Sequence, residues 1–181
     1  ECLLKARYWE ESMPEVLARL GEAAKASQVC VFQNYGDTNG MLHARRRNKW
    51  IASVAPNHNG QPELEDIPFQ QVGLERWVEL LDQGKPVYGR VTDLPSVEQK
   101  LLNSQGIRSI AVVPIFVEHA WWGLIAFHDH LSEREWSLTD IGALKAAAST
   151  LGAAIQRERV QSELERAKEA AESANRAKSE F

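Results

Sequence analysis

Two histidines near residue 130 are the side chains in this sequence whose spacing comes nearest to a chemical site. His128 and His130 flank Asp129 in an apolar stretch that reads as a β-strand, so both imidazoles share one face of the strand. Imidazole and carboxylate groups bind transition metals, but a tetrahedral site needs further ligands, and none follows at a recognisable spacing. We therefore expect no metal here and interpret both histidines as solvated residues at a strand end.

The other reactive residue types lack the partners that catalysis requires. Cys2 and Cys30 form neither a disulfide framework nor a zinc motif, and the apolar run around Cys30 predicts a buried thiol. The sequence contains no nucleophile elbow and no phosphate-binding loop. We predict that this chain is catalytically silent and expect no cofactor.

Composition excludes several classes of partner. A chain of 181 residues that is 44% hydrophobic fits one globular domain with an appended helix. The net charge is −4 and basic residues cluster only at Arg45–Arg47, so we expect no nucleic-acid partner. There is no apolar stretch of the ~20 residues needed to span a bilayer. We expect a cytoplasmic location without direct membrane contact, although an anchor elsewhere in a parent protein stays possible.

Periodicity predicts the elements that would position these residues. Apolar residues at helical spacing predict an amphipathic helix over 3–26, with Pro14 setting its start or a kink near Ser12. Alternating or apolar runs predict strands at 28–35, 41–54, 87–94, 107–117 and 121–130. Short helices are predicted at 73–83 and, capped by Ser96, at 96–104, and a long helix opens at Ser137 or Thr139. Residues 55–72 are predicted to form a loop over one face of the sheet. This order predicts an α+β fold, an antiparallel sheet flanked by helices.

Three positions in the last two strands carry sharper expectations. Pro114 cannot donate to a strand ladder, so its strand should lie at an edge or carry a bulge there. Gly123 allows a neighbour to approach the backbone closely. Trp121 and Trp122 should point to opposite faces of the sheet.

The segment 106–137 resembles the C-terminal half of a GAF domain. The motifs that carry the resemblance are Gly-Ile-x-Ser, which begins at Gly106, Val-Pro-Ile at 113–115, Trp-Gly at 122–123 and Ser-x-Arg-x-Trp at 132–136. The stretch 84–95 also fits that family. The resemblance covers about residues 8–159 and implies a GAF sensor domain over residues 1–159, including the N-terminal helix.

The C-terminal stretch 160–181 is charged and rich in alanine, and its apolar residues follow the 3.5-residue period of a coiled-coil seam. The seam residues are Val160, Leu164, Ala167, Ala171 and Ala174. The run AKSEF resembles the helix that leads into the phosphoacceptor helix of bacterial sensor histidine kinases. This resemblance implies a two-component system and an ATP-dependent protein-histidine phosphotransferase as parent protein. The heptad seam predicts a homodimer, which we expect to be parallel and to form through the flanking helices, and the resemblance implies a downstream kinase domain in the same chain. No histidine stands in the His-Glu-x-x-x-Pro-Leu context of a phosphoacceptor, so we expect this chain to be the sensory portion of a longer kinase.

Two apolar stripes on the long helix indicate two packing partners. Leu144, Ala148, Leu151 and Ile155 form the first stripe, and the seam that begins at Val160 is displaced from it by two residues, about 200° around the helix. We expect the first stripe to pack on the domain's own sheet and the seam on a partner helix. A helix shared between two packings can carry a small movement from sensor to kinase.

The GAF resemblance also implies a ligand cavity between the sheet and the covering segment, here about residues 55–105. We predict a small, partly apolar ligand, with Arg90 or Arg108 available to fix an anionic group. The candidate pocket residues are Trp77, Tyr88, Arg90, Arg108, Trp121 and Phe127. The alternative is that these aromatic residues only fill the core. Cys30 lacks the setting of the bilin-binding cysteine in phytochrome-like relatives, and Phe127 and Asp129 do not reproduce the residue set of cyclic-nucleotide-binding relatives.

These observations predict a sensory GAF domain that relays a signal to a histidine kinase. Two alternatives stay open: a ligand-free dimerisation spacer, and a GAF domain that regulates a diguanylate cyclase-type output. A filled pocket would separate the sensor from the spacer. The residues that follow position 181 in the parent protein would separate kinase from cyclase.

Overall fold

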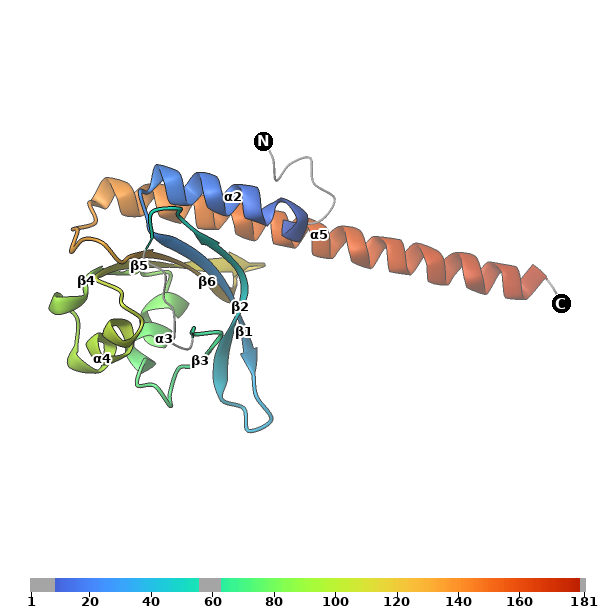
Figure 1. Ribbon diagram of the computed structural model, residues 1–181. Helices are drawn as coiled ribbons and strands as arrows, with labels where there is room; N and C mark the ends of the chain where they lie inside the picture. The colour runs from blue at the N-terminus through green and yellow to red at the C-terminus, as the bar shows by residue number, and fades with distance from the viewer. Residues whose placement is uncertain (1–8, 56–62, 180–181) are drawn as a thin grey trace.

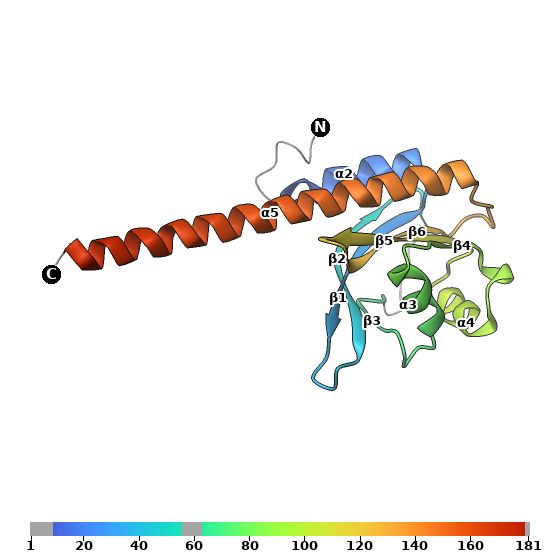
Figure 2. The same ribbon diagram turned by 180° about the vertical axis from the view of Figure 1, so that it is seen from behind.

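The computed structural model describes residues 9–55 and 63–179, and its middle layer is a six-stranded antiparallel sheet. The strand order is β3-β2-β1-β6-β5-β4. Helices α2 and α5 lie on one face of the sheet and α3 and α4 on the other, while the second half of α5 projects away from the domain (Figures 1 and 2). The predicted α+β arrangement is confirmed.

The bounds of the elements follow the sequence pattern closely. The strands are β1 (Gln28–Gly36), β2 (Leu42–Ile51), β3 (Asp66–Pro68), β4 (Val87–Arg90), β5 (Ser109–Val117) and β6 (Ala120–Asp129). The helices are α2 (Trp9–Ala23), α3 (Glu75–Asp82), the short 3-10 helix η1 (Val91–Asp93), α4 (Ser96–Ser104) and α5 (Leu138–Ser179). Among the described residues, no helix combines the length and the apolar character that crossing a membrane requires.

The central strands are apolar on both faces because each face supports a separate core. On β1, Val29 and Val31 pack toward α2 and α5, whereas Cys30 and Phe32 pack toward α3 and α4. The same alternation continues on β6, where Phe127 faces the α2–α5 side. Alternate residues of one continuous apolar strand thus pack against helices on opposite faces of the sheet.

Helix α5 packs on the sheet through the predicted stripe. Leu144, Ala148, Leu151 and Ile155 are all buried in the core beneath it. At Gly152 the helix comes so close to β5 that a Cβ atom would stand 2.2 Å from the carbonyl oxygen of Phe116. The expectation that the first stripe faces the domain's own sheet is confirmed.

The β5–β6 hairpin also matches its predictions. Pro114 lies beyond the end of β4, whose pairing with β5 stops at Val112, so β5 has an open edge there. Gly123 accommodates β1, because a Cβ atom would stand 2.0 Å from the Phe32 carbonyl oxygen. Trp122 is buried on the α2–α5 face and Trp121 packs against the opposite core.

The turn of this hairpin consists of Glu118 and His119, and both have positive φ angles, 52° and 67°. Two consecutive residues with positive φ between paired strands are typical of a type I′ turn. Neither residue is glycine or asparagine, so this turn stores some backbone strain.

Several local expectations require correction. Helix α2 does not begin at Ser12: it already starts by Trp9 and continues through Pro14, and residues 3–8 of the predicted helix lie outside the described residues. Pro95, not Ser96, occupies the N-cap position of α4, and no side chain caps that end. The predicted strand 87–94 ends at Arg90, where the chain turns into η1.

The predicted loop 55–72 contains a short strand, β3, which the sequence pattern did not indicate. It pairs with β2 over three residues, from Asp66 opposite Arg45 to Pro68 opposite His43. Side chains reinforce this pairing, because Asp66 accepts a hydrogen bond from the Tyr35 hydroxyl (2.7 Å) and lies 2.9 Å from Nδ1 of His43. These contacts join residues distant in sequence, which explains why local periodicity missed the strand.

Candidate functional site

A cavity lies between the sheet and its covering segment, on the face opposite α2 and α5. Its volume is about 60 Å³. The floor comes from β1 and β6 through Cys30, Phe32, Leu124 and Ala126. This is the layer in which the ligand cavity was predicted.

The walls of the cavity are apolar and come from the covering segment. Leu74 and Trp77 line it from the start of α3, and Leu101 and Leu102 from α4. Both helices are held together by an ion pair in which Nε and Nη2 of Arg76 donate to the two carboxylate oxygens of Glu98, each at 2.6 Å. The Glu98 side chain is only 2% exposed, so this bidentate ion pair is partly buried and joins α3 to α4.

Polar side chains gather at one end of the cavity. Nδ1 of His130 donates to the carbonyl oxygen of Gly106 (2.9 Å), and Nε2 of His130 lies 3.2 Å from the side-chain amide oxygen of Gln28. The Gln28 amide nitrogen lies 3.2 Å from Sγ of Cys30. His128 also lines the cavity, and its ring meets that of His130 edge to face at 6.0 Å between centroids. The cavity therefore offers one polar end to an otherwise apolar occupant.

Charged residues of β2 and of residues 63–65 lie on one side of the cavity. Lys49 donates to both carboxylate oxygens of Glu63 at 2.7 Å, and Arg46 reaches Glu63 at 3.0 Å and Glu65 at 3.2 Å. The hydrogen bond from Lys49 is the main cause that lowers the pKa of Glu63, with the charge of Arg46 acting in the same direction. Arg46 and Glu63 both line the cavity as an already neutralised pair.

Of the six predicted pocket residues, Trp77 lines this cavity. Trp121 lies on the same face of the sheet, where its ring packs 5.9 Å from that of Phe69. Phe127 lies on the opposite face, fully buried under α5, because odd-numbered residues of β6 point that way at this end. Whether Trp77 and Trp121 contact a ligand stays a prediction.

The other three predicted residues stand outside the cavity lining. Tyr88 is partly exposed on β4, and Arg90 pairs with Asp93 and Glu135. Arg108 lies 3.5 Å from the carbonyl oxygen of Leu131. The structure thus does not bring Arg90 and Arg108 into the cavity lining, whereas Arg46 does line it.

The polar end includes residues that sequence reasoning had interpreted differently. His130 is not a solvated strand-end residue: it is buried and holds the hydrogen bonds described above. Alternation on β6 placed His128 and His130 on one face, but local spacing did not indicate that Gln28 and Gly106 would contact His130. Contacts across more than twenty residues in the chain are not encoded in local spacing.

The chemistry available in the cavity favours binding over catalysis. Burial raises the pKa of the Cys30 thiol to about 11, so the group stays protonated at neutral pH. Among residues 9–55 and 63–179, no three histidine, cysteine or acidic side chains come together as a metal site. What the cavity does offer is a shaped apolar surface with a hydrogen-bonding end.

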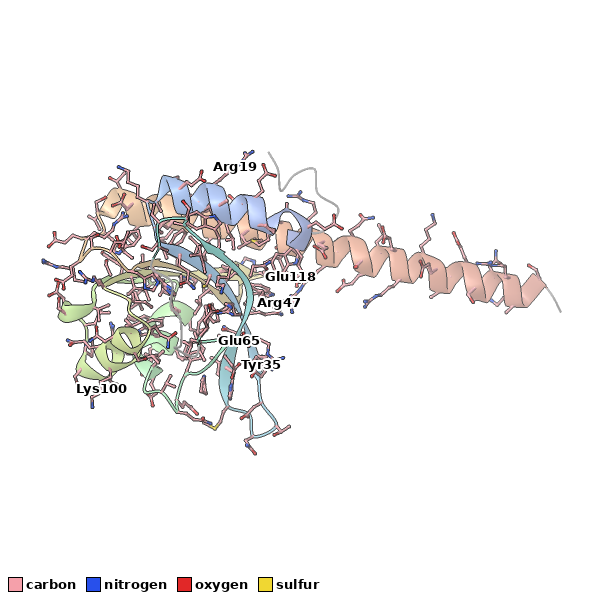
Figure 3. All side chains as sticks on the ribbon, in the orientation of Figure 1. Arg19, Tyr35, Arg47, Glu65, Lys100 and Glu118 are labelled. Carbon is pink, nitrogen blue, oxygen red and sulfur yellow. The ribbon has the colours of Figure 1, made fainter. Side chains whose placement is uncertain are left out.

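A second, charged hollow lies where α5 leaves the domain. The backbone N–H of Trp9 donates to Glu158 of α5 at 2.7 Å, and Arg47 of β2 pairs with Glu10 of α2. Figure 3 shows Arg47 and Glu118 near this exit. The part of α5 that leaves the domain is therefore hydrogen-bonded to α2 and lies close to the end of the sheet.

Comparison with known proteins agrees with this architecture. Residues 9–155 match the GAF domain family, and the chain belongs to that family. A curated relative, the methanogenesis regulatory histidine kinase FilI of Methanothrix harundinacea (strain 6Ac), is 37% identical over 154 residues. The match covers 85% of this chain but only 17% of that protein.

Solved structures with the same fold include GAF domains of cyanobacterial proteins. The blue-light-absorbing form of the PixJ GAF domain of Thermosynechococcus elongatus superposes with a TM-score of 0.67 at 20% identity, covering 88% of this chain and 91% of that one. The phycocyanobilin-bound GAF domain of a cyanobacterial phytochrome gives a TM-score of 0.69 at 18% identity, covering 84% and 87%. At these identities the likeness establishes the fold.

Proposed function

We propose that this chain is the sensory GAF domain of a histidine kinase and that it relays the state of its cavity to the kinase through α5. The observation that carries the proposal is that the cavity lies on one face of the sheet and α5, the output helix, lies on the other face. The 37% identity to FilI supports a kinase as the output. On this proposal the parent kinase is cytoplasmic in this region.

The relay has a physical route through β5. Ser109, fully buried at the start of β5, accepts a hydrogen bond from Nε1 of Trp136 (2.8 Å), and its hydroxyl lies 2.8 Å from the Arg134 carbonyl oxygen. The same hydroxyl lies 3.2 Å from the carbonyl oxygen of Gly89 in β4. Because Trp136 lies two residues before the first residue of α5, a shift of β4 would be passed to the start of that helix. Further along, Gly152 holds α5 against the backbone of β5.

The signal would then travel along the free part of α5. Beyond Ile155 this helix has no buried residue in the domain, and Val160 and Leu164 are 51% and 63% exposed. Exposed apolar residues at heptad spacing favour a helix that pairs with a second copy. We propose a parallel homodimer through the predicted seam, with the kinase domain downstream in the same chain.

Incubation with ATP tests the kinase assignment. The parent protein should become labelled on histidine, whereas this 181-residue chain should not, because the proposal places neither the nucleotide site nor the phosphoacceptor within it. A labelled histidine within this chain, or a parent protein that turns over GTP to a cyclic dinucleotide and not ATP, would contradict the proposal. The second result would favour the cyclase-type alternative.

A bilin is not the occupant that this cavity favours. The cavity volume of about 60 Å³ suits a compact molecule better than a linear tetrapyrrole, and the Cys30 thiol, with its raised pKa, is a poor nucleophile for forming a thioether. We therefore propose a compact, mainly apolar occupant in place of a bilin. The spacer alternative requires that changes in the cavity leave the output unaffected.

A further inference from the structure

The indole N–H of Trp77 is a buried hydrogen-bond donor to which the described part of the chain offers no acceptor. The Trp77 side chain lines the cavity, and the residue is only 3% exposed. Other indoles in the protein are bonded: Nε1 of Trp136 donates to Oγ of Ser109 and Nε1 of Trp121 to the carbonyl oxygen of Gly123, both at 2.8 Å. A buried donor without an acceptor is costly, because folding has removed its hydrogen bond to water. A bound molecule that carries an acceptor would remove this cost.

Trp77 is the position where such a donor and the cavity coincide. The other buried side-chain atoms without a partner in the described residues belong to Asn34, His43 and Asn48. None of these three residues lines the cavity. The unpartnered donor of Trp77 therefore identifies a hydrogen-bonding point in the cavity wall, which is otherwise mainly apolar.

The charged residues of the cavity lining already bind one another. Arg46 pairs with Glu63 at 3.0 Å and with Glu65 at 3.2 Å, and Glu63 also accepts from Lys49. A carboxylate in the cavity would have to displace one of these acids from Arg46, and it would lose its own hydration on entering. The lining therefore favours a neutral occupant over an anionic one.

The volume of the cavity limits the size of that occupant. About 60 Å³ is available, and a buried water molecule needs about 10–15 Å³ of such volume, so about four to six non-hydrogen atoms fit. Phe32, Leu74, Leu102 and Leu124 supply apolar surface around this space. Most of the occupant should therefore be hydrocarbon, with one polar group for Trp77.

We infer that the cavity takes a neutral molecule of about four to six non-hydrogen atoms, such as a small ketone, whose carbonyl-type oxygen accepts a hydrogen bond from Nε1 of Trp77. The inference rests on the proposed sensor function and adds to it the chemical class of the ligand and the residue that selects it. Trp77 lies on α3, beside Arg76, which joins α3 to α4, and residues 83–86 connect α3 to β4. A molecule held by Trp77 thus acts on the segment that leads into β4, where the proposed route to α5 begins.

Two probes of matched size and shape test the hydrogen bond. Cyclopentanone and methylenecyclopentane have the same number of non-hydrogen atoms and differ in a C=O group against a C=CH₂ group. Their dissociation constants are measured by NMR titration of the 181-residue chain and of Trp77→Phe, which keeps an aromatic ring but has no N–H. Comparing the ratio of the two constants between the proteins cancels the different hydration of the probes. The ratio should favour the ketone about tenfold more in the unaltered chain than in Trp77→Phe.

Trp136→Phe is the matched control, because it removes an indole N–H that is already bonded to Ser109 and lies in the opposite core. Its ratio should equal that of the unaltered chain. A second readout does not depend on how well Trp77→Phe folds. In the unaltered chain, the indole N–H resonance of Trp77 should move downfield with cyclopentanone and not with methylenecyclopentane.

The outcomes separate this inference from the function on which it rests. Equal ratios in the unaltered chain and in Trp77→Phe, or no binding of cyclopentanone to the unaltered chain, would overturn the inference. Tighter binding of butyrate, an anion of similar size, would overturn the neutral class. These results leave the sensor function in place if Ala126→Leu still changes autophosphorylation of the parent kinase. A ketone preference that depends on Trp77, in a protein whose kinase rate Ala126→Leu does not alter, would support the binding class and contradict the sensor function.

Discussion

Replacing Gly152 by alanine should loosen the output helix, although alanine is the better helix former. A Cβ atom at this position would lie 2.2 Å from the Phe116 carbonyl oxygen, and ordinary contacts begin near 3.4 Å, so α5 must move away from β5 by about 1 Å. Overpacking of this kind costs about 1–3 kcal/mol, against a gain of about 1 kcal/mol from helix propensity.

Gly142 in the same helix is the matched control, because a Cβ atom there would meet nothing within 4 Å. Gly142→Ala should therefore raise the free energy of unfolding by about 1 kcal/mol, and the two variants should differ by about 1–3 kcal/mol. Urea denaturation at one fixed protein concentration, followed by circular dichroism, measures this difference. If both alanine variants stabilise the protein equally, α5 does not pack on the β5 backbone as described.

Two further predictions concern the sheet. The hydrogen bond to Asp66 is the main cause that raises the pKa of His43 above its ordinary value of 6.5, and the charge of Asp37 acts in the same direction. The cluster therefore stabilises the fold fully below pH 6.5, and this stabilisation is lost as the pH rises through the raised pKa. His43→Gln should remove this pH dependence of the unfolding free energy between about pH 6 and pH 8, and an unaltered profile would contradict the assignment. The double substitution Glu118→Asn with His119→Gly should stabilise the protein by about 1 kcal/mol in thermal unfolding, because both turn residues have positive φ; a destabilised variant would mean that the side chains there contribute more than the strain.

Periodicity and turn residues were sufficient to predict most of the fold. The stripe through Leu144 and Leu151 identified the sheet-facing side of α5, and alternation placed Trp121 and Trp122 on opposite faces. These features depend on neighbours within one turn or one strand. Strand β3 was missed because it depends on His43 and Asp66, whose contact spans distant parts of the chain.

The cavity could be placed in the correct layer but not described residue by residue. Trp77 is among the residues that line the cavity, whereas Phe127 points to the other face, because periodicity alone does not determine which residues of β6 point to which side. The arginines chosen for an anionic group stand elsewhere, and the polar end depends on Gln28 meeting His130 across the sheet. Strand register determines such meetings, and register cannot be read from one strand alone.

The most direct test of the central claim fills the cavity in the parent protein. Ala126 is buried on β6 and lines the cavity, so Ala126→Leu places an isobutyl group where an occupant would lie; Ala23→Leu, at an exposed position on α2, is the matched control. If the cavity controls the output helix, autophosphorylation of the parent kinase with ATP should change about fivefold or more in Ala126→Leu and stay unchanged in Ala23→Leu. A folded Ala126→Leu protein that phosphorylates itself at the rate of the unaltered kinase would contradict the sensor function and favour the spacer.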